Sequence, residues 1–279
     1  MSNTVDASYY NQSLRIFRID HAGALVANLT MQRGQEYGNG GDFNIGSAGG
    51  MVSNCVVEAG YTRDNGKAGG AWLDAGVVTH TVFRKNNTNS GSVWWNSAPS
   101  EGVLHLGGSS RAENCLFDDN SQYVAVTLVG VEGSAVLRNC SIVNTGLSST
   151  NEGCSVWSAL KIASGATVQN VVIAGVTNTI DGAACPPTGS GVANFLNGAF
   201  DGDATGLPEG TVTGTAAEFF KDYANGDYTP KTGGPLVGKG ANYEGMASVD
   251  LAGNRRLVGS KVDIGCYEAS SAAFIIIVR

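Results

Sequence analysis

The sequence predicts an all-β fold, a solenoid made of coils of short parallel strands, and two observations predict it. A short phrase of the form apolar-x-Asn-(small or Cys)-x-apolar recurs six times, at intervals of 25 to 34 residues. Just upstream of each phrase, apolar residues alternate with a period of two. A unit that repeats at such a period cannot bury its apolar face alone, so the units must stack. The phrases are Val26-Ala27-Asn28, Val52-Ser53-Asn54, Val78-Thr79-His80, Ala112-Glu113-Asn114, Leu137-Arg138-Asn139 and Val168-Gln169-Asn170.

The upstream alternation predicts the first strand of each coil, bounded by Gly- and Ser-rich turns. No helical stripe of period 3.6 interrupts residues 1–200. Neighbouring coils of parallel strands would lie ~4.8 Å apart. The predicted first strands are Phe17-x-Ile19, Phe43-x-Ile45, Ala71-x-Leu73, Leu104-x-Leu106, Val126-x-Leu128 and Leu160-x-Ile162.

Aligned on the Asn, the phrases place apolar residues in columns that we predict to be interior ladders. The Asn stands where two strand pieces must bend, because Asn tolerates the left-handed backbone region and its amide can bond to the next coil. His80 replaces Asn in the third coil, and we interpret it as a turn substitute. The column three residues after the Asn contains Met31, Val57, Phe83, Phe117, Ile142 and Ile173.

This combination resembles the right-handed parallel β-helix repeat proteins, and the C-terminus strengthens the resemblance. Four pieces there look like the closing segment of bacterial secreted β-helix proteins of the choice-of-anchor type. They are Tyr223-Ala224-Asn225-Gly226-Asp227-Tyr228, Gly234-Pro235-Leu236-Val237, Asp250-Leu251-Ala252-Gly253-Asn254-Arg255 and Val262-Asp263-Ile264-Gly265-Cys266-Tyr267-Glu268. The resemblance covers residues 14–268 and implies an extracellular or cell-surface location and contact with polysaccharide, but no particular reaction.

We therefore expect a right-handed parallel β-helix over residues 1–200, a closing segment over 201–268 packed on it, and an apolar tail over 269–279. A degenerate seventh coil is expected around Val192-Ala193-Asn194-Phe195. The outward residues of the third strands form an apolar stripe, which either the closing segment or a partner chain must cover. They are Val56, Val82, Leu116 and Val172.

The charge of the chain limits its partners. A formal net charge of −7 without clustered Lys and Arg argues against nucleic acid. An anionic glycan would need a local basic patch.

Residues 1–20 show no apolar segment of a secretory signal, and we expect a fragment that lacks its leader. The apolar stretch at 274–278 is shorter than the ~20 residues that a transmembrane helix needs. The sequence does not indicate an oligomeric state.

Six cysteines are too few for a disulfide scaffold in 279 residues. Cys55, Cys115 and Cys140 fall in one interior column, where they pack as small apolar residues. Cys154 and Cys185 each follow a repeat Asn by the same number of residues. These two therefore occupy equivalent loop positions on adjacent coils, which predicts a disulfide between them.

The outward positions of the first strands carry the side chains that could bind or react. Aromatic rings among carboxylates and amides are typical of a sugar site, because the ring stacks on the apolar sugar face while polar groups bind hydroxyls. The alternative is an ordinary solvated surface. The column contains Arg18, Asn44, Trp72, His105, Thr127 and Lys161, with Asp20 and Asp74 beside it and Asp42 at the start of its strand.

The longest interval between phrases lies between His80 and Asn114. Its insertion contains Trp94 and Trp95, just before the strand that carries His105. A small β-turn does not need two adjacent tryptophans in a polar loop. We expect them either to close over the groove and contact the ligand, or to pack over the end of the sheet.

Two enzymatic alternatives use the same groove. In a polysaccharide lyase, Asp42 and Asp74 would hold calcium, with Arg18 or His105 acting on the sugar. In a glycoside hydrolase, the same two carboxylates would lie ~5–5.5 Å or ~6.5–9.5 Å apart. No other cofactor is indicated. The leading hypothesis is a secreted or surface module that recognises polysaccharide, ahead of these enzymes and of a structural stalk or adhesin.

Overall fold

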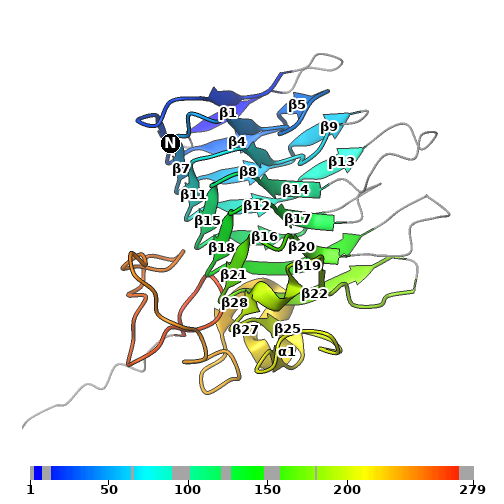
Figure 1. Ribbon diagram of the computed structural model, residues 1–279, viewed down its shortest axis with the longest axis vertical. Helices are drawn as coiled ribbons and strands as arrows, with labels where there is room; N and C mark the ends of the chain where they lie inside the picture. Colours follow the sequence, from blue (N-terminus) through cyan, green and yellow to red (C-terminus); the bar gives the residue numbers. More distant parts are fainter. Residues whose placement is uncertain are drawn as a thin grey trace, which may run out of the picture.

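The chain forms a parallel β-helix, as the sequence predicts. The computed structural model describes residues 3–7, 14–63, 66–89, 101–120, 127–147, 158–179 and 181–269. Figure 1 shows the coils stacked from the N-terminal end, in blue, to the green coils around β22, with the yellow to red closing segment at the other end. Each described coil adds strands to three sheets, and the strand pairs within these sheets are parallel.

We number the sheets in the order in which a coil reaches them. Sheet 1 contains β2 (Phe17–Ile19), β6 (Phe43–Ile45), β10 (Ala71–Leu73), β14 (Glu101–Leu106), β17 (Thr127–Val131), β20 (Ser158–Ile162) and β23 (Pro187–Thr188). Sheet 2 contains β3 (Leu25–Ala27), β7 (Met51–Ser53), β11 (Val77–Thr79), β15 (Arg111–Glu113), β18 (Val136–Arg138), β21 (Thr167–Gln169) and β24 (Phe195–Leu196). Sheet 3 contains β1 (Thr4–Asp6), β4 (Thr30–Gln32), β8 (Val56–Glu58), β12 (Val82–Arg84), β16 (Leu116–Asp118), β19 (Ser141–Leu147), β22 (Val172–Asn178), β25 (Ala199–Phe200) and β26 (Val212–Thr213). A smaller sheet 4 contains β5 (Gln35–Glu36), β9 (Tyr61–Arg63) and β13 (Asn87–Asn89).

The interior columns are as the sequence predicts. Met31, Val57, Phe83, Phe117, Ile142 and Ile173 have no exposed surface, and the strand register places each one beside its copy in the next coil. The rings of Phe83 and Phe117 stack with their centroids 5.0 Å apart. Cys115 and Cys140 are likewise fully buried. The solenoid is therefore held by one continuous apolar core.

The repeated Asn turns the chain between sheets 2 and 3. All six residues of this Asn column have a left-handed backbone, a conformation that non-glycine residues other than Asn, Asp and His rarely adopt. The side chains also bond from coil to coil, since the amide of Asn54 donates to Asn28 at 2.6 Å and that of Asn170 donates to Asn139 at 2.8 Å. The φ angles are 59° for Asn28, 52° for Asn54, 47° for His80, 53° for Asn114, 49° for Asn139 and 57° for Asn170. His80 is thus confirmed as a turn substitute.

Two details of the repeat differ from the prediction. In the seventh coil, Phe195 pairs with Val168, so Asn197, with a φ of 48°, takes the position expected for Asn194. The short 3₁₀ turn η1 (Val192–Asn194) precedes that strand instead of forming the bend. Here the apolar residue before the Asn is Phe195, and the phrase Val192-Ala193-Asn194 matches the pattern by chance.

Residues 201–269 form the closing segment, which lies at the C-terminal end of the solenoid (Figure 1) and covers the outer face of sheet 3 from Val82 on β12 to Ala199 on β25. Its helix α1 (Ala216–Phe219) begins with a capping box between Thr215 and Glu218, and β27 (Phe220–Asp222), η2 (Tyr223–Asn225) and β28 (Asp227–Pro230) form a hairpin. The apolar stripe predicts this cover, which reaches Val82, Leu116 and Val172 but not Val56. The covered residues of sheet 3 include Leu116, Val143, Val172, Ala174 and Ala199, and the covering residues include Phe219, Phe220, Tyr228, Leu236, Ile264 and Cys266.

The closing segment also forms hydrogen bonds with residues of the Asn column. The amide of Asn139 donates to the Tyr243 hydroxyl at 2.6 Å, and Asn170 exchanges two hydrogen bonds with the backbone of Ala241 at 2.8 and 2.9 Å. The guanidinium of Arg138 lies 4.4 Å from the centre of the Tyr243 ring. The amides that turn the solenoid therefore also hold its cover.

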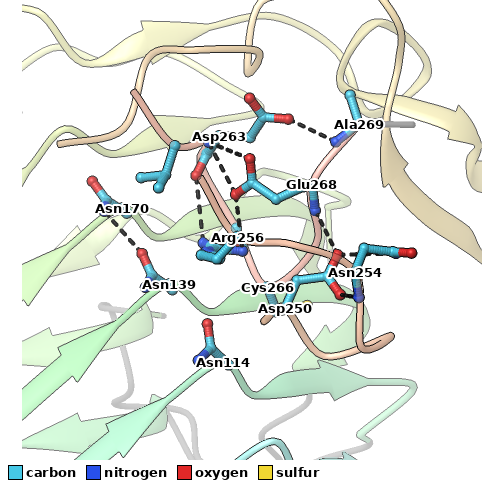
Figure 2. A network of polar contacts seen from close by, with 12 residues as sticks. Asn114, Asn139, Asn170, Asp250, Asn254, Arg256, Asp263, Cys266, Glu268 and Ala269 are labelled. Atoms are coloured by element: carbon cyan, nitrogen blue, oxygen red, sulfur yellow. Dashed lines mark hydrogen bonds and ion pairs between the residues drawn. The ribbon is translucent and has the colours of Figure 1, made fainter. Parts of the chain in front are cut away.

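A buried polar network holds together the C-terminal part of the closing segment, residues 250–269 (Figure 2). Arg256 has no exposed surface, and its guanidinium lies 3.3 Å from Glu268 Oε1 and donates to Gly265 O. The carboxylate of Glu268 accepts the backbone N–H of Asp263 at 3.1 Å. Asp250 accepts the N–H groups of Asn254 at 2.8 Å and Glu268 at 2.9 Å. Two of the four C-terminal sequence pieces thus meet in one network.

Glu268 pairs with the Arg256 guanidinium and lies near the charges of two further carboxyl groups. Burial is the main reason that the pKa of Glu268 is raised to about 8, and the charges of Asp263 and Asp250 raise it further, although Arg256 opposes the shift. A carboxyl group that is shielded from water and lies near two other negative charges is costly to ionise, so it keeps its proton to a higher pH. The network is therefore sensitive to pH.

Candidate functional site

The outer face of sheet 1 brings together most of the predicted site residues. Arg18, Asn44, Trp72 and His105 are register neighbours on four successive strands. Arg18 is exposed, Asn44 and Trp72 are partly buried, and His105 retains 5% of its surface. The prediction that these four side chains share one column is confirmed.

Trp72 is held in a fixed orientation at the centre of this column. Its ring lies on the His105 ring, with the centroids 3.5 Å apart and an angle of 8° between the planes. Its indole N–H donates to Asp74 Oδ1 at 2.8 Å. The second face of the indole points away from His105, toward the coil that carries Asn44. A partly exposed aromatic ring, ordered by His105 and Asp74, is therefore built into the outer face of sheet 1.

Two exposed carboxylates lie beside this ring. The register places Asp20 and Asp74 level with Gly46, one coil on either side of it. Their backbones are therefore two strand spacings apart, roughly 9–10 Å. Asp20 leans over Gly46, where its Oδ1 accepts the Ala48 N–H at 2.9 Å. In the sequence, the signal for this pair is the glycine at position 46, which leaves space beside Asp20.

Asp42 does not belong to this site, and its predicted placement in the groove is wrong. Its side chain has no exposed surface, and its Oδ1 accepts the Gly34 N–H at 2.8 Å inside the solenoid. It also precedes β6, whereas Asp74 follows β10, so the two residues lie at opposite ends of neighbouring strands. They cannot form the carboxylate pair of a hydrolase or share a calcium ion.

The corner after sheet 3 explains why Asp42 is buried. In later coils, the residue at this corner accepts a bond from its copy one coil earlier: Gly60 N–H donates to Asn86 Oδ1 at 2.9 Å, and Asn86 N–H donates to Asn120 Oδ1 at 3.0 Å. Gly34 has no such acceptor, because the next corner residue is Gly60. A Cβ on Gly60 would lie 2.1 Å from Asp42 Oδ2. The Asp42 carboxyl therefore fills the place of the missing amide.

This substitution changes the chemistry of the carboxyl group. Its Oδ2 is buried and has no hydrogen-bond partner among the described residues. Burial raises the pKa of Asp42 well above its ordinary value, the hydrogen bond from Gly34 opposes the shift, and the charge of Glu58 adds to it. A neutral carboxylic acid resembles the amides of Asn86 and Asn120, and this is the form that the corner favours.

The column is interrupted beyond His105. In β17 the residue beside His105 is Gly130, and Thr127 is paired with Glu101 and Ser158 and is buried, so the predicted outward position of Thr127 is wrong. The alternation runs Val129-Gly130-Val131, in which a glycine hides the outward position. Lys161 occupies the next position and lies 3.8 Å from Glu132 Oε1. Lys161 is thus separated from the Trp72 ring.

Other predicted residues bear less on the site. Cys185 is a buried free thiol, which does not support the predicted bridge to Cys154, and burial raises the pKa of this thiol to about 12. Cys154, Trp94, Trp95 and the apolar stretch 274–278 lie outside the described residues. Within the described part of the chain, no group of three or more His, Cys, Asp or Glu residues could hold a metal ion.

We compared the chain with protein-family models, with curated proteins and with solved structures, and none of the three comparisons gave a match. The relationship to bacterial β-helix proteins of the choice-of-anchor type therefore stays a prediction. Among the described residues, no helix has the length and apolar character needed to cross a membrane.

Proposed function

We propose that this protein is a secreted or cell-surface module that recognises polysaccharide through the outer face of sheet 1. The orientation of Trp72, fixed by His105 on one face and by Asp74 at its N–H, is the observation that carries the proposal. A ring that is already ordered loses little conformational entropy when a ligand stacks on it. The proposed location rests on the resemblance of the C-terminal sequence pieces.

Polar groups around the ring complete the proposed site. Asp20 and Asp74 are exposed acceptors, Arg18 is an exposed donor, and the amide of Asn44 offers both. Together they match a sugar, which presents hydroxyl groups along its rim and C–H groups on its face. The spacing of coils at ~4.8 Å also gives a row in which successive sugar units of one chain meet successive strands.

A second candidate function is glycoside hydrolysis, favoured by the register of Asp20 and Asp74 on either side of Gly46. Both side chains are exposed, and that of Asp20 leans over the intervening Gly46, which has no side chain of its own. Inverting hydrolases separate their carboxyl groups by about 6.5–9.5 Å. This pair replaces the Asp42 and Asp74 pair as the candidate catalytic set.

A glycan array with the whole chain, followed by affinity electrophoresis on each polysaccharide that binds, tests the proposal. Trp72→Ala should weaken binding by about 1–3 kcal/mol through the lost stacking surface, whereas Trp72→Phe should keep much of it. Leu25→Ala is the matched control, because Leu25 is 63% exposed on the outer face of sheet 2. Equal retention of the Trp72→Ala and wild-type proteins on every ligand would reject the site.

Reducing-end assays on the same ligands distinguish the hydrolase. Cleavage that Asp74→Asn abolishes while binding persists would establish the enzymatic alternative. Binding without cleavage by the wild-type protein would leave recognition as the function.

A further inference from the structure

A second surface, at the C-terminal end of the solenoid, has the character of an anion site. A hollow with a volume of about 590 Å³ lies between the edge strand β26, helix α1 and the turn after β28. This volume is in the range of about 300–1,000 Å³ that is usual for small-ligand sites. Its lining residues are Thr213, Glu218, Lys231, Thr232, Gly233, Gly234, Pro235 and Lys239.

The two lysines of this hollow carry charge that the described residues do not neutralise. Neither Lys231 nor Lys239 lies within 4.0 Å of a described carboxylate, and the Lys231 ammonium has only a long hydrogen bond of 3.5 Å to Ala217 O. By contrast, Lys221 on the same hairpin pairs with Asp227 at 3.1 Å. The hollow is therefore a basic patch on a chain whose net charge is −7.

The carboxylate in the hollow is already engaged. Glu218 Oε2 accepts the Thr215 N–H at 2.8 Å and the Thr215 hydroxyl at 3.0 Å. These hydrogen bonds, with the charge of Lys231 as a smaller cause, lower the pKa of Glu218. Because Glu218 caps α1 instead of pairing with a lysine, both ammonium groups stay available to a ligand.

The turn from Lys231 to Gly234 adds neutral donors. Gly234 N–H donates to Lys231 O at 2.7 Å, and Gly233 has a φ of 70°, as the third residue of a type II turn requires. Within the described part of the chain, the backbone N–H groups of Thr232 and Gly233 donate no hydrogen bond. Thr213 and Thr232, each with a hydroxyl group, are also among the residues that line the hollow.

We propose that this hollow binds the anionic group of an acidic polysaccharide, a carboxylate or a sulfate on one sugar unit. The two ammonium groups would hold the anion by charge-assisted hydrogen bonds, and the threonine hydroxyls and backbone N–H groups would bind the hydroxyls of the adjoining sugar. This site is independent of the Trp72 face and stands whether or not that face binds a glycan.

Calorimetric titration of the whole chain tests this proposal with three probes: an oligogalacturonate, a dextran sulfate fragment and a neutral dextran fragment. The wild-type protein should bind at least one of the two anionic probes more tightly than the neutral one. The double variant Lys231→Ala and Lys239→Ala should bind that probe about tenfold more weakly. Lys221→Ala removes one exposed cation from the same hairpin and is the matched control, with affinity expected to equal that of the wild type.

The probes and variants also separate the alternatives. Binding of only the uronate or only the sulfate probe supports the site and identifies the group. Unchanged affinity in the double lysine variant, an equal loss in Lys221→Ala, or no binding of either anionic probe would overturn the proposal. Trp72→Ala should leave the affinity for this site unchanged, so a failure of the sheet 1 proposal and a failure of this one give different results.

Discussion

The outer faces of sheet 1 and sheet 3 belong to the same coils but differ in what covers them. On sheet 3, Leu116, Val143 and Val172 are buried beneath the closing segment. On sheet 1, the corresponding face presents Arg18, Asn44 and Trp72 at least partly to solvent. The same coils therefore present one apolar, covered face and one polar, open face, and the side chains that point outward make the difference.

Because only one of the two faces is covered, the two contribute differently to the free energy of folding. An outward apolar column contributes to the free energy of folding only when something covers it, at about 25 cal/mol per Å² of buried apolar surface. An outward polar column needs no such cover, and we propose that the ordered ring in it binds a ligand. The two faces should therefore respond differently to mutation.

The largest effect is expected for the cover of sheet 3. Phe220 is 1% exposed, and its ring centroid lies 5.5 Å from that of Tyr228 and 6.1 Å from that of Tyr223. Phe220→Ala should lower the free energy of unfolding by about 3–5 kcal/mol, through lost burial and the cavity left behind. Urea unfolding measures this loss, and a change below about 1 kcal/mol would show that the closing segment is not packed as described.

The next effect is a pH dependence from the buried network. The pKa of Glu268 is raised to about 8 in the folded state. Its proton therefore contributes to stability in full at pH values below the ordinary carboxyl pKa, and this contribution is lost as the pH rises through about 8. Relative to Glu268→Gln, the wild-type free energy of unfolding should fall by roughly 2–4 kcal/mol between pH 4.5 and pH 9, because solvent screens part of the full effect of the shift. Parallel pH profiles for the two proteins would contradict the shift.

A smaller effect of opposite sign is expected for Asp42→Asn. The amide copies the neutral acid and the side chains of Asn86 and Asn120, so it should remove the cost of ionising a buried carboxyl group. Since the pKa of Asp42 is raised, the wild-type protein loses stability as pH rises, and the variant should be more stable by roughly 1–3 kcal/mol at pH 8. Asp20→Asn, at an exposed carboxylate, is the control, and destabilisation by Asp42→Asn would reject the corner assignment.

The smallest effect on stability is expected at the open face. Trp72→Ala should change the free energy of unfolding by less than about 1 kcal/mol, because the ring is only partly buried and rests mainly on one neighbour. Chemical unfolding of this variant beside Phe220→Ala measures the contrast. A loss as large as that of Phe220→Ala would make Trp72 a structural residue.

The sequence predicts the coil geometry well because packing repeats in it. The left-handed φ of Asn28 through Asn170 and the buried column of Phe83 and Phe117 both follow from short local patterns. Errors arise where a side chain is missing. Gly130 hides the outward position of its coil, and Gly60 creates the interior place that Asp42 fills. Both positions depend on which residues of neighbouring coils lie side by side, and a local sequence pattern does not contain that information.

The division between the two faces is tested most directly by measuring unfolding free energy and glycan affinity together for Trp72→Ala and Phe220→Leu. Phe220→Leu, a milder change than Phe220→Ala, should lower the unfolding free energy by about 1–2 kcal/mol and leave affinity for the best array ligand unchanged. Trp72→Ala should lower that affinity at least about fivefold and leave unfolding almost unchanged. The opposite pattern, with Trp72→Ala destabilising the fold and retaining full affinity, would contradict the account.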